Sequence, residues 1–225
     1  AVAEVAAKTI DIARPHVAEA LECAEGEVIF ADGVFSSANT NHSITIEDLV
    51  LRLVPDNGAH PFDIKHQYET DGATYPYGCH VVELEVDPGT CKVDLLRYTV
   101  IDDFGAVINP MTLEGQVHGG IAQGIGQAIY EYAAFDDQGQ LVAGSLMDYT
   151  LPRADDLPRF DISFRNIPCK NNILGLKGSG EAGAIGAPQA VIAALTDALG
   201  VTHIDMPATP QAIWEALQGK REAAE

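Results

Sequence analysis

The first third of the chain alternates apolar and polar positions in ways that predict one long helix and one hairpin. Between residues 2 and 22, apolar residues recur at helical spacing, and Pro15 is expected to interrupt that helix. Residues 27–30 and 34–37 read as short strands on either side of the turn at residues 31–33, which is typical of a β-hairpin.

A loop-rich stretch then suggests an internal boundary. Thr45 is placed to cap a short helix over residues 46–53. Residues 55–76 are rich in Pro, Gly, His and Asp and predict a loop. We therefore expect two portions of one continuous fragment, a helix–hairpin–helix portion at 1–75 and a more regular portion at 76–225.

The second portion opens with an antiparallel hairpin and a capped helix. Residues 80–86 alternate apolar and acidic side chains, and residues 92–101 form the returning strand after a Pro-Gly turn. Asn109 followed by Pro110 is a typical helix start, because Asn caps the free N–H groups and Pro suits the first helical position. The helix is expected to extend over residues 110–134.

That helix is unusual in its glycine content. Each glycine costs roughly 1 kcal/mol relative to alanine in a helix interior, so close approach of another backbone or a ligand is expected to offset the cost. The glycines lie at positions 115, 119, 120, 124 and 126, and the pairs Gly115/Gly119 and Gly120/Gly124 are each spaced to share a face.

Further strands are predicted at 141–146 and 160–164, and a strand-like run at 172–177 precedes a helix at 188–199. Strand pairs and helices mix without strict β-α-β alternation. The pattern therefore predicts the α+β class, with mixed, largely antiparallel sheets and packed helices in two-layer lobes.

Charge and cysteine content narrow the classes of function. The chain has 13 Lys and Arg against 33 Asp and Glu, a net charge of −20, which disfavours nucleic acid and anionic membranes as partners. Four cysteines lack metal-ligand spacing, so no residue of this chain is expected to ligate a metal directly. No membrane span and no signal peptide are evident, and a cytoplasmic location is expected.

The loop at residues 178–183 has the clearest chemical content. It matches the glycine pattern of dinucleotide-binding loops and presents one carboxylate, Glu181, where few side chains can cover it. A dinucleotide site would need a complete βαβ unit, and Glu181 would repel a pyrophosphate. The remaining interpretations are a general base and an exposed loop carboxylate.

Other candidates each have a plain structural alternative. Gln116 has the donors and acceptor that suit the polar edge of a cofactor, or it is an exposed helix residue. His118 is more simply explained as a packed or solvated helix histidine. Asp102 and Asp103 are a possible carboxylate pair, but turn chemistry between strand and helix is the simpler explanation.

Three segments in fixed order resemble one family. They are Gly115–Ala128, Asp148–Pro152 and Gly178–Gly183, and they follow the order found in the molybdenum hydroxylases, which include xanthine dehydrogenase, aldehyde oxidase and aerobic carbon monoxide dehydrogenase large subunits. The chain resembles their C-terminal molybdopterin-binding domain, and most of all that of the carbon monoxide dehydrogenase-like large subunits.

The resemblance implies molybdenum held by molybdopterin, in bacteria often as the cytosine dinucleotide. Glu181 falls on the family's catalytic base, which activates a hydroxyl group on molybdenum (Mo–OH). Gln116 falls on a cofactor-contacting glutamine, and the backbone of Gly178, Ser179 and Gly180 would line the cofactor. Ser179 stands where the family commonly has an apolar residue.

The resemblance also implies partners. Family large subunits are several times longer, so the N-terminal large-subunit domains are missing, and FAD and iron–sulfur clusters (2Fe-2S) would be on partner domains or subunits. The fragment is expected to be inactive alone, and a homodimer is left open. The alternatives are a cofactor-free assembly or binding module that packs against a partner domain, and a dinucleotide-binding protein that uses residues 178–183.

Overall fold

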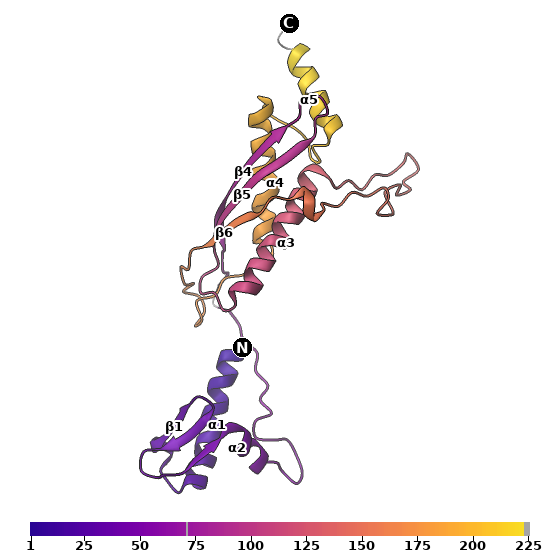
Figure 1. The fold of residues 1–225 in the computed structure, drawn as a ribbon. Coiled ribbons are helices and arrows are strands. Elements are labelled where there is room, and N and C mark those ends of the chain that lie inside the picture. The colour runs from indigo at the N-terminus through magenta and orange to yellow at the C-terminus, as the bar shows by residue number, and fades with distance from the viewer. Residues whose placement is uncertain (71, 223–225) are drawn as a thin grey trace. The chain divides into compact units, whose positions relative to one another are not determined.

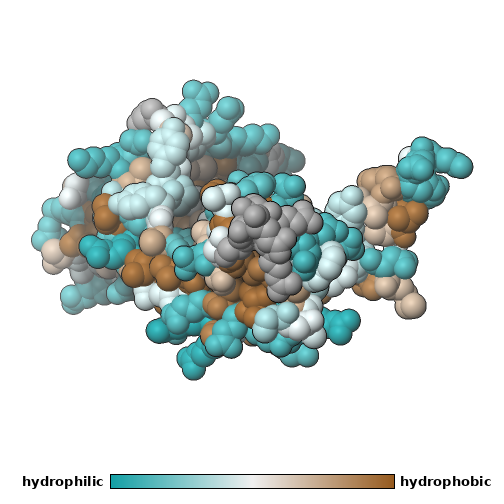
Figure 2. Space-filling model, turned by 90° about the horizontal axis from the view of Figure 1, so that it is seen from above, coloured by the Kyte–Doolittle hydropathy of each residue, from teal (hydrophilic) through white to brown (hydrophobic). Residues whose placement is uncertain are grey.

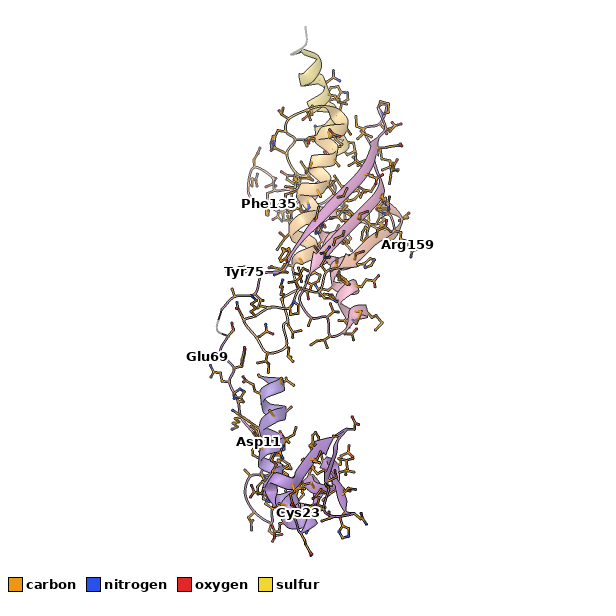
Figure 3. All side chains as sticks on the ribbon, turned by 90° about the vertical axis from the view of Figure 1, so that its left-hand side faces the viewer. Asp11, Cys23, Glu69, Tyr75, Phe135 and Arg159 are labelled. Atoms are coloured by element: carbon orange, nitrogen blue, oxygen red, sulfur yellow. The ribbon has the colours of Figure 1, made fainter. Side chains whose placement is uncertain are left out.

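The computed structural model describes residues 1–70 and 72–222 and divides the chain into two compact units, Ala1–Glu69 and Thr70–Glu225. Each unit combines helices with a small three-stranded sheet, which confirms the predicted α+β class with largely antiparallel sheets. Glu69 is the last residue of the first unit, and Tyr75 lies in the second unit shortly before its first strand (Figure 3).

The first unit packs one long helix on its sheet. Helix α1 (Val2–Leu21) continues through Pro15, contrary to the expected interruption, because its apolar face is buried in the core of this unit and packing outweighs the lost backbone hydrogen bond. The core contains Val17, Leu21, Phe35 and Leu49. The other elements are a short 3₁₀ turn η1 (Glu25–Glu27), strands β1 (Val28–Ala31), β2 (Val34–Ser37) and β3 (Ser43–Thr45), and helix α2 (Ile46–Arg52).

The predicted cap of α2 is confirmed. The Thr45 hydroxyl oxygen accepts a hydrogen bond from the Asp48 backbone N–H at 3.0 Å, and the Thr45 hydroxyl donates to the Asp48 carboxylate at 2.8 Å. The sheet is antiparallel throughout, in the order β1-β2-β3.

The second unit is a two-layer arrangement of a mixed sheet and helices (Figure 1). Strands β4 (Tyr77–Val86) and β5 (Val93–Asp103) are antiparallel, and β6 (Phe160–Phe164) pairs in parallel with β5. Helices α3 (Pro110–Ile129) and α4 (Ala182–Leu199) pack on one another, and α4 packs on β4. Helix α5 (Pro210–Glu222) follows, and a short 3₁₀ turn η2 (Ala154–Asp156) precedes β6.

The core of this unit lies between the layers. Tyr98 and Val100 from β5, Ile121 from α3, and Val191 and Leu195 from α4 are fully buried together. Helix α4 is long and apolar enough, by composition alone, to meet the minimum for a membrane span, but one of its faces is part of this core.

Several predicted boundaries are wrong. Helix α3 ends at Ile129 rather than at residue 134, and α4 begins at Ala182 rather than at Pro188. Within the described residues, 141–146 and 172–177 form no strand: Leu141 and Leu176 each make only an isolated bridge, to Phe135 and Gly105.

The segment between α3 and η2 extends away from the helices and exposes apolar side chains (Figures 1 and 2). Phe135 lies on it (Figure 3). The large exposed apolar side chains here belong to Tyr132, Phe135, Leu141, Val142, Leu146, Met147 and Leu151.

Two of the helix glycines permit close packing of α3 on α4. A Cβ atom at Gly120 would lie 2.9 Å from the Ala184 nitrogen, and one at Gly124 would lie 2.6 Å from the Ala187 Cβ. Gly115 and Gly119 instead have nothing within 4 Å of such an atom in the described chain. The Gly120/Gly124 face therefore serves helix packing, while the Gly115/Gly119 face is open.

This difference gives a matched pair of variants. Gly120→Ala is expected to lower the free energy of unfolding by about 1–3 kcal/mol, because the added methyl group is forced against the backbone of α4. Gly119→Ala is expected to raise it by up to about 1 kcal/mol through helix propensity alone. Denaturant unfolding followed by circular dichroism measures both. Equal effects in the two variants would contradict the assigned packing.

Candidate functional site

The site begins at the amino end of α3. The Asn109 side-chain oxygen accepts the Thr112 N–H at 3.0 Å, and Pro110 occupies the first turn, as predicted. Gln116 follows within the same helix on an exposed surface. The Nδ1–H group of His118 donates a 2.8 Å hydrogen bond to the Glu114 carbonyl, since a carbonyl can only accept. The His118 ring also packs on Phe160, with the ring centres 5.4 Å apart, which agrees with a packed helix histidine.

The second element is the loop that leads into α4. The Lys177 N–H donates to the Phe104 carbonyl at 3.0 Å, and the Ala106 N–H donates to the Gly175 carbonyl at 2.9 Å. Gly105 has φ +69°, and a Cβ atom there would lie 2.1 Å from the Gly175 oxygen. These contacts fix the loop against the residues that follow β5. Among the described residues, no strand leads directly into the loop, as a dinucleotide-binding unit would require.

The two motifs meet directly. The Gln116 Nε2 group donates a 2.8 Å hydrogen bond to the Gly180 carbonyl, although 64 residues separate them. A pocket of about 270 Å³ lies beside this contact and is lined in part by Asn109, Gln116, Lys177 and Ser179. The structure thus brings Gln116 and the glycine-rich loop together on one surface.

Glu181 lies at the start of α4, in the N-cap position with φ −113° and ψ −4°. Its carbonyl accepts the N–H groups of Ala184 and Ile185 at 3.0 Å each. Its side chain is exposed and has no hydrogen bond or ion pair within the described residues. A carboxylate free of such contacts is available to accept a proton from a bound group.

The loop backbone offers further hydrogen-bond donors. The Gly178 N–H donates to the Thr74 hydroxyl at 3.3 Å, but those of Ser179, Gly180 and Glu181 have no partner in the part of the chain that the structure describes. Gly178 and Gly180 have open space where a Cβ atom would be. Free N–H groups before a helix suit the hydrogen-bond acceptors of a polar cofactor edge, so these residues fit such a group.

A buried ion pair supports this loop, and the sequence did not indicate it. The Lys177 Nζ atom lies 2.7 Å from Asp103 Oδ2, and the two side chains are 8% and 1% exposed. The other Asp103 oxygen accepts the N–H groups of Gly105 at 2.8 Å and Ile167 at 3.2 Å. The Lys177 ammonium also lies 4.5 Å from the centre of the Tyr77 ring.

These contacts shift the pKa values of Asp103 and of the neighbouring Tyr77. Burial alone would raise the pKa of Asp103, but hydrogen bonds from Lys177, Gly105, Tyr77 and Ile167 outweigh it and lower the pKa to about 2. The pKa of Tyr77 is raised, first by its hydrogen bond to Asp103. The expected turn chemistry is seen at Asp103, whose Oδ1 atom accepts the N–H of Gly105 two residues on, but not at Asp102, which is buried near the end of β5.

Known proteins resemble this chain over most of its length. Residues 1–158 match the molybdopterin cofactor-binding domain family. The chain is 36% identical over 168 residues to the carbon monoxide dehydrogenase large chain of Hydrogenophaga pseudoflava, covering 73% of this chain and 21% of that protein. It is 33% identical over 212 residues to the nicotine 6-hydroxylase large subunit of Paenarthrobacter nicotinovorans, covering 90% and 26%.

Solved structures show the same likeness. Carbon monoxide dehydrogenase from Oligotropha carboxidovorans superposes with a TM-score of 0.80 at 27% identity, over 99% of this chain and 28% of that one. Quinoline 2-oxidoreductase from Pseudomonas putida 86 gives 0.77 at 31% identity, over 96% and 28%. The chain thus spans about a quarter of these relatives' length. It belongs to the molybdenum hydroxylase family, of which it contains part of the molybdopterin-binding region.

Proposed function

We propose that this chain is the part of a molybdenum hydroxylase large subunit that contacts the molybdopterin cofactor and supplies the general base of the oxidoreductase. The hydrogen bond from Gln116 to the Gly180 carbonyl carries the proposal, because it joins the two cofactor-type motifs at one pocket. The bound cofactor would supply the redox chemistry and activate the oxygen nucleophile.

The chain's own residues have separate roles in this proposal. Gln116 and the backbone of Gly178, Ser179 and Gly180 would hold the polar edge of the cofactor, and of these Gln116 and Ser179 line the pocket. Glu181 accepts a proton from the bound group, because its carboxylate is exposed at the end of the same loop. The Lys177–Asp103 pair fixes the loop that presents it.

The cytosine dinucleotide form, the partner-borne FAD and 2Fe-2S clusters and the cytoplasmic location remain parts of this proposal. The missing large-subunit domains are its first expected partner, since the relatives are about four times longer. Exposed apolar residues such as Phe135, Leu146 and Met147 favour packing against such a domain. This observation also favours the second candidate, a cofactor-free assembly module, and leaves a homodimer open.

Metal and pterin analysis separates the two candidates. The chain is purified alone and after co-expression with the remaining large-subunit domains, and molybdenum is measured per polypeptide. We expect molybdenum in the complex and little or none in the lone chain. Gln116→Ala should reduce molybdenum in the complex, whereas Gln138→Ala, on the exposed segment after α3, should not. A complex without molybdenum would favour the assembly module.

A further inference from the structure

A second pocket, of about 120 Å³, lies between the start of β4 and the first turn of α4. Pro76, Tyr77 and Ile185 contribute largely apolar walls, and Asp102 and His80 contribute the polar groups. The Asp102 and His80 side chains are only 4% and 8% exposed. The pocket is thus mostly apolar, with a buried carboxylate among its lining groups.

The Asp102 carboxylate is incompletely paired. Its Oδ2 atom is buried and has no hydrogen-bond partner among the described residues. Its Oδ1 atom lies 3.6 Å from His80 Nε2, which is longer than a normal hydrogen bond. A buried carboxylate is costly unless donors compensate for the lost water, so Oδ2 needs a donor from outside this set of residues.

His80 is hydrogen-bonded through its other ring nitrogen and is closely packed. Its Nδ1 atom is 2.7 Å from the Tyr98 hydroxyl, and a Cβ atom on Gly186 would lie 2.7 Å from its ring. Burial, and then the Asp102 charge, raise the pKa of Tyr98, so the phenol keeps its proton while it is hydrogen-bonded to His80 Nδ1. The ring is therefore fixed between β5 and α4.

The chemistry of the missing donor follows from the pocket. A divalent metal needs several oxygen ligands, and no group of three or more acidic, His or Cys residues within the described chain could hold one. The net charge of −20 attracts cations and repels anions. An alkyl chain would contact Tyr77 and Ile185 while its ammonium group pairs with the Asp102 carboxylate that lines the pocket.

We propose that Asp102 forms the base of a binding site for a primary alkylammonium group, either a free amine or the side chain of a lysine from another polypeptide segment. The inference does not rest on the proposed function, because binding at this pocket requires no molybdenum. Failure of the molybdenum test therefore leaves it intact.

The experiment is a titration of the ¹⁵N-labelled chain with n-butylammonium chloride, followed by NMR, with n-butanol and sodium chloride as neutral and ionic controls. We expect saturable shifts of the amides of Tyr77–His80 and Ala182–Gly186 with the amine only. Asp102→Asn should weaken binding at least about tenfold, because the charge partner is removed. Asp161→Asn, at a half-exposed aspartate paired with Arg97, should leave the affinity unchanged.

A second variant covers the case in which Asp102→Asn fails to fold. Ile185 is 64% exposed, so Ile185→Lys should fold, place its own ammonium group in the pocket and abolish butylammonium binding, while Ile185→Met should retain it. No saturable shift in the native chain, or unchanged affinity in Ile185→Lys, would overturn the proposal.

A further titration distinguishes the two sources of the ammonium group. Nα-acetyl-lysine methylamide presents the same group on a peptide unit. Binding within about threefold of butylammonium would identify a lysine side chain as the natural ligand, because this change is small on the free-energy scale. Binding of butylammonium alone would identify a free amine, since the peptide unit is then too bulky for the entrance.

Discussion

Glu181→Gln is expected to leave molybdenum content unchanged and to lower turnover by about 10²- to 10⁴-fold in the complex with the remaining large-subunit domains. The amide keeps the size and one acceptor of the carboxylate but cannot accept the proton. Because the Glu181 side chain makes no contact that stabilises the described fold, the substitution should not disturb α4. Single-turnover absorbance changes and molybdenum analysis measure the two quantities separately.

Glu114→Gln is the matched control, since Glu114 is also an exposed glutamate and lies on α3, two residues from Gln116. It should retain both metal and turnover. Full turnover in Glu181→Gln would reject the assignment of Glu181 as the base. Loss of molybdenum together with turnover would instead make Glu181 part of cofactor binding.

The sequence predicted correctly those elements that depend on contacts between residues close together in the chain. The Asn109 and Thr45 caps rest on contacts three residues apart, and the β4–β5 hairpin rests on alternation and a Pro-Gly turn. The start of α4 was missed because Pro188 was taken as its first residue. In the structure Pro188 lies inside α4 and packs against Gly124 of α3, and this tertiary contact offsets the missing N–H group.

Strand predictions failed where no partner strand exists. Residues 141–146 have an apolar composition, but their side chains are mostly exposed on the extended segment. Residues 172–177 turn at Gly175, which has φ +67°, so the run cannot continue as a strand. Apolar composition alone does not supply the neighbouring strand that a ladder needs.

The two motifs of the candidate site were recognised in the sequence, but the buried ion pair that supports the loop was not. Gln116 and Glu181 were singled out from the glycine-rich segments, and the resemblance added their expected roles. The structure places Gln116 against the residue before Glu181. Asp103 could not be assigned to Lys177, because 74 residues separate them and only the fold brings them together. The only local signal was a lysine four residues before Glu181 in an otherwise uncharged loop.

Lys177→Met is expected to lower the free energy of unfolding of the second unit by about 3–5 kcal/mol, because it leaves the buried Asp103 carboxylate without its charge partner. The loop that leads to Glu181 should loosen as well, since Lys177 ties it to the end of β5. Denaturant unfolding measures the first effect, and hydrogen exchange of the amides of residues 178–184 measures the second.

Lys92→Met is the control, because Lys92 and Asp94 form an exposed pair, with side chains 67% and 55% accessible, and should cost less than about 1 kcal/mol. Asp103 has a folded-state pKa of about 2, below its ordinary value of 3.8. Its contribution to stability is therefore complete above the ordinary value and is lost as pH falls toward 2. Asp103→Asn should remove that acid-sensitive part of the stability, whereas equal losses in Lys177→Met and Lys92→Met would show that the buried pair does not support the loop.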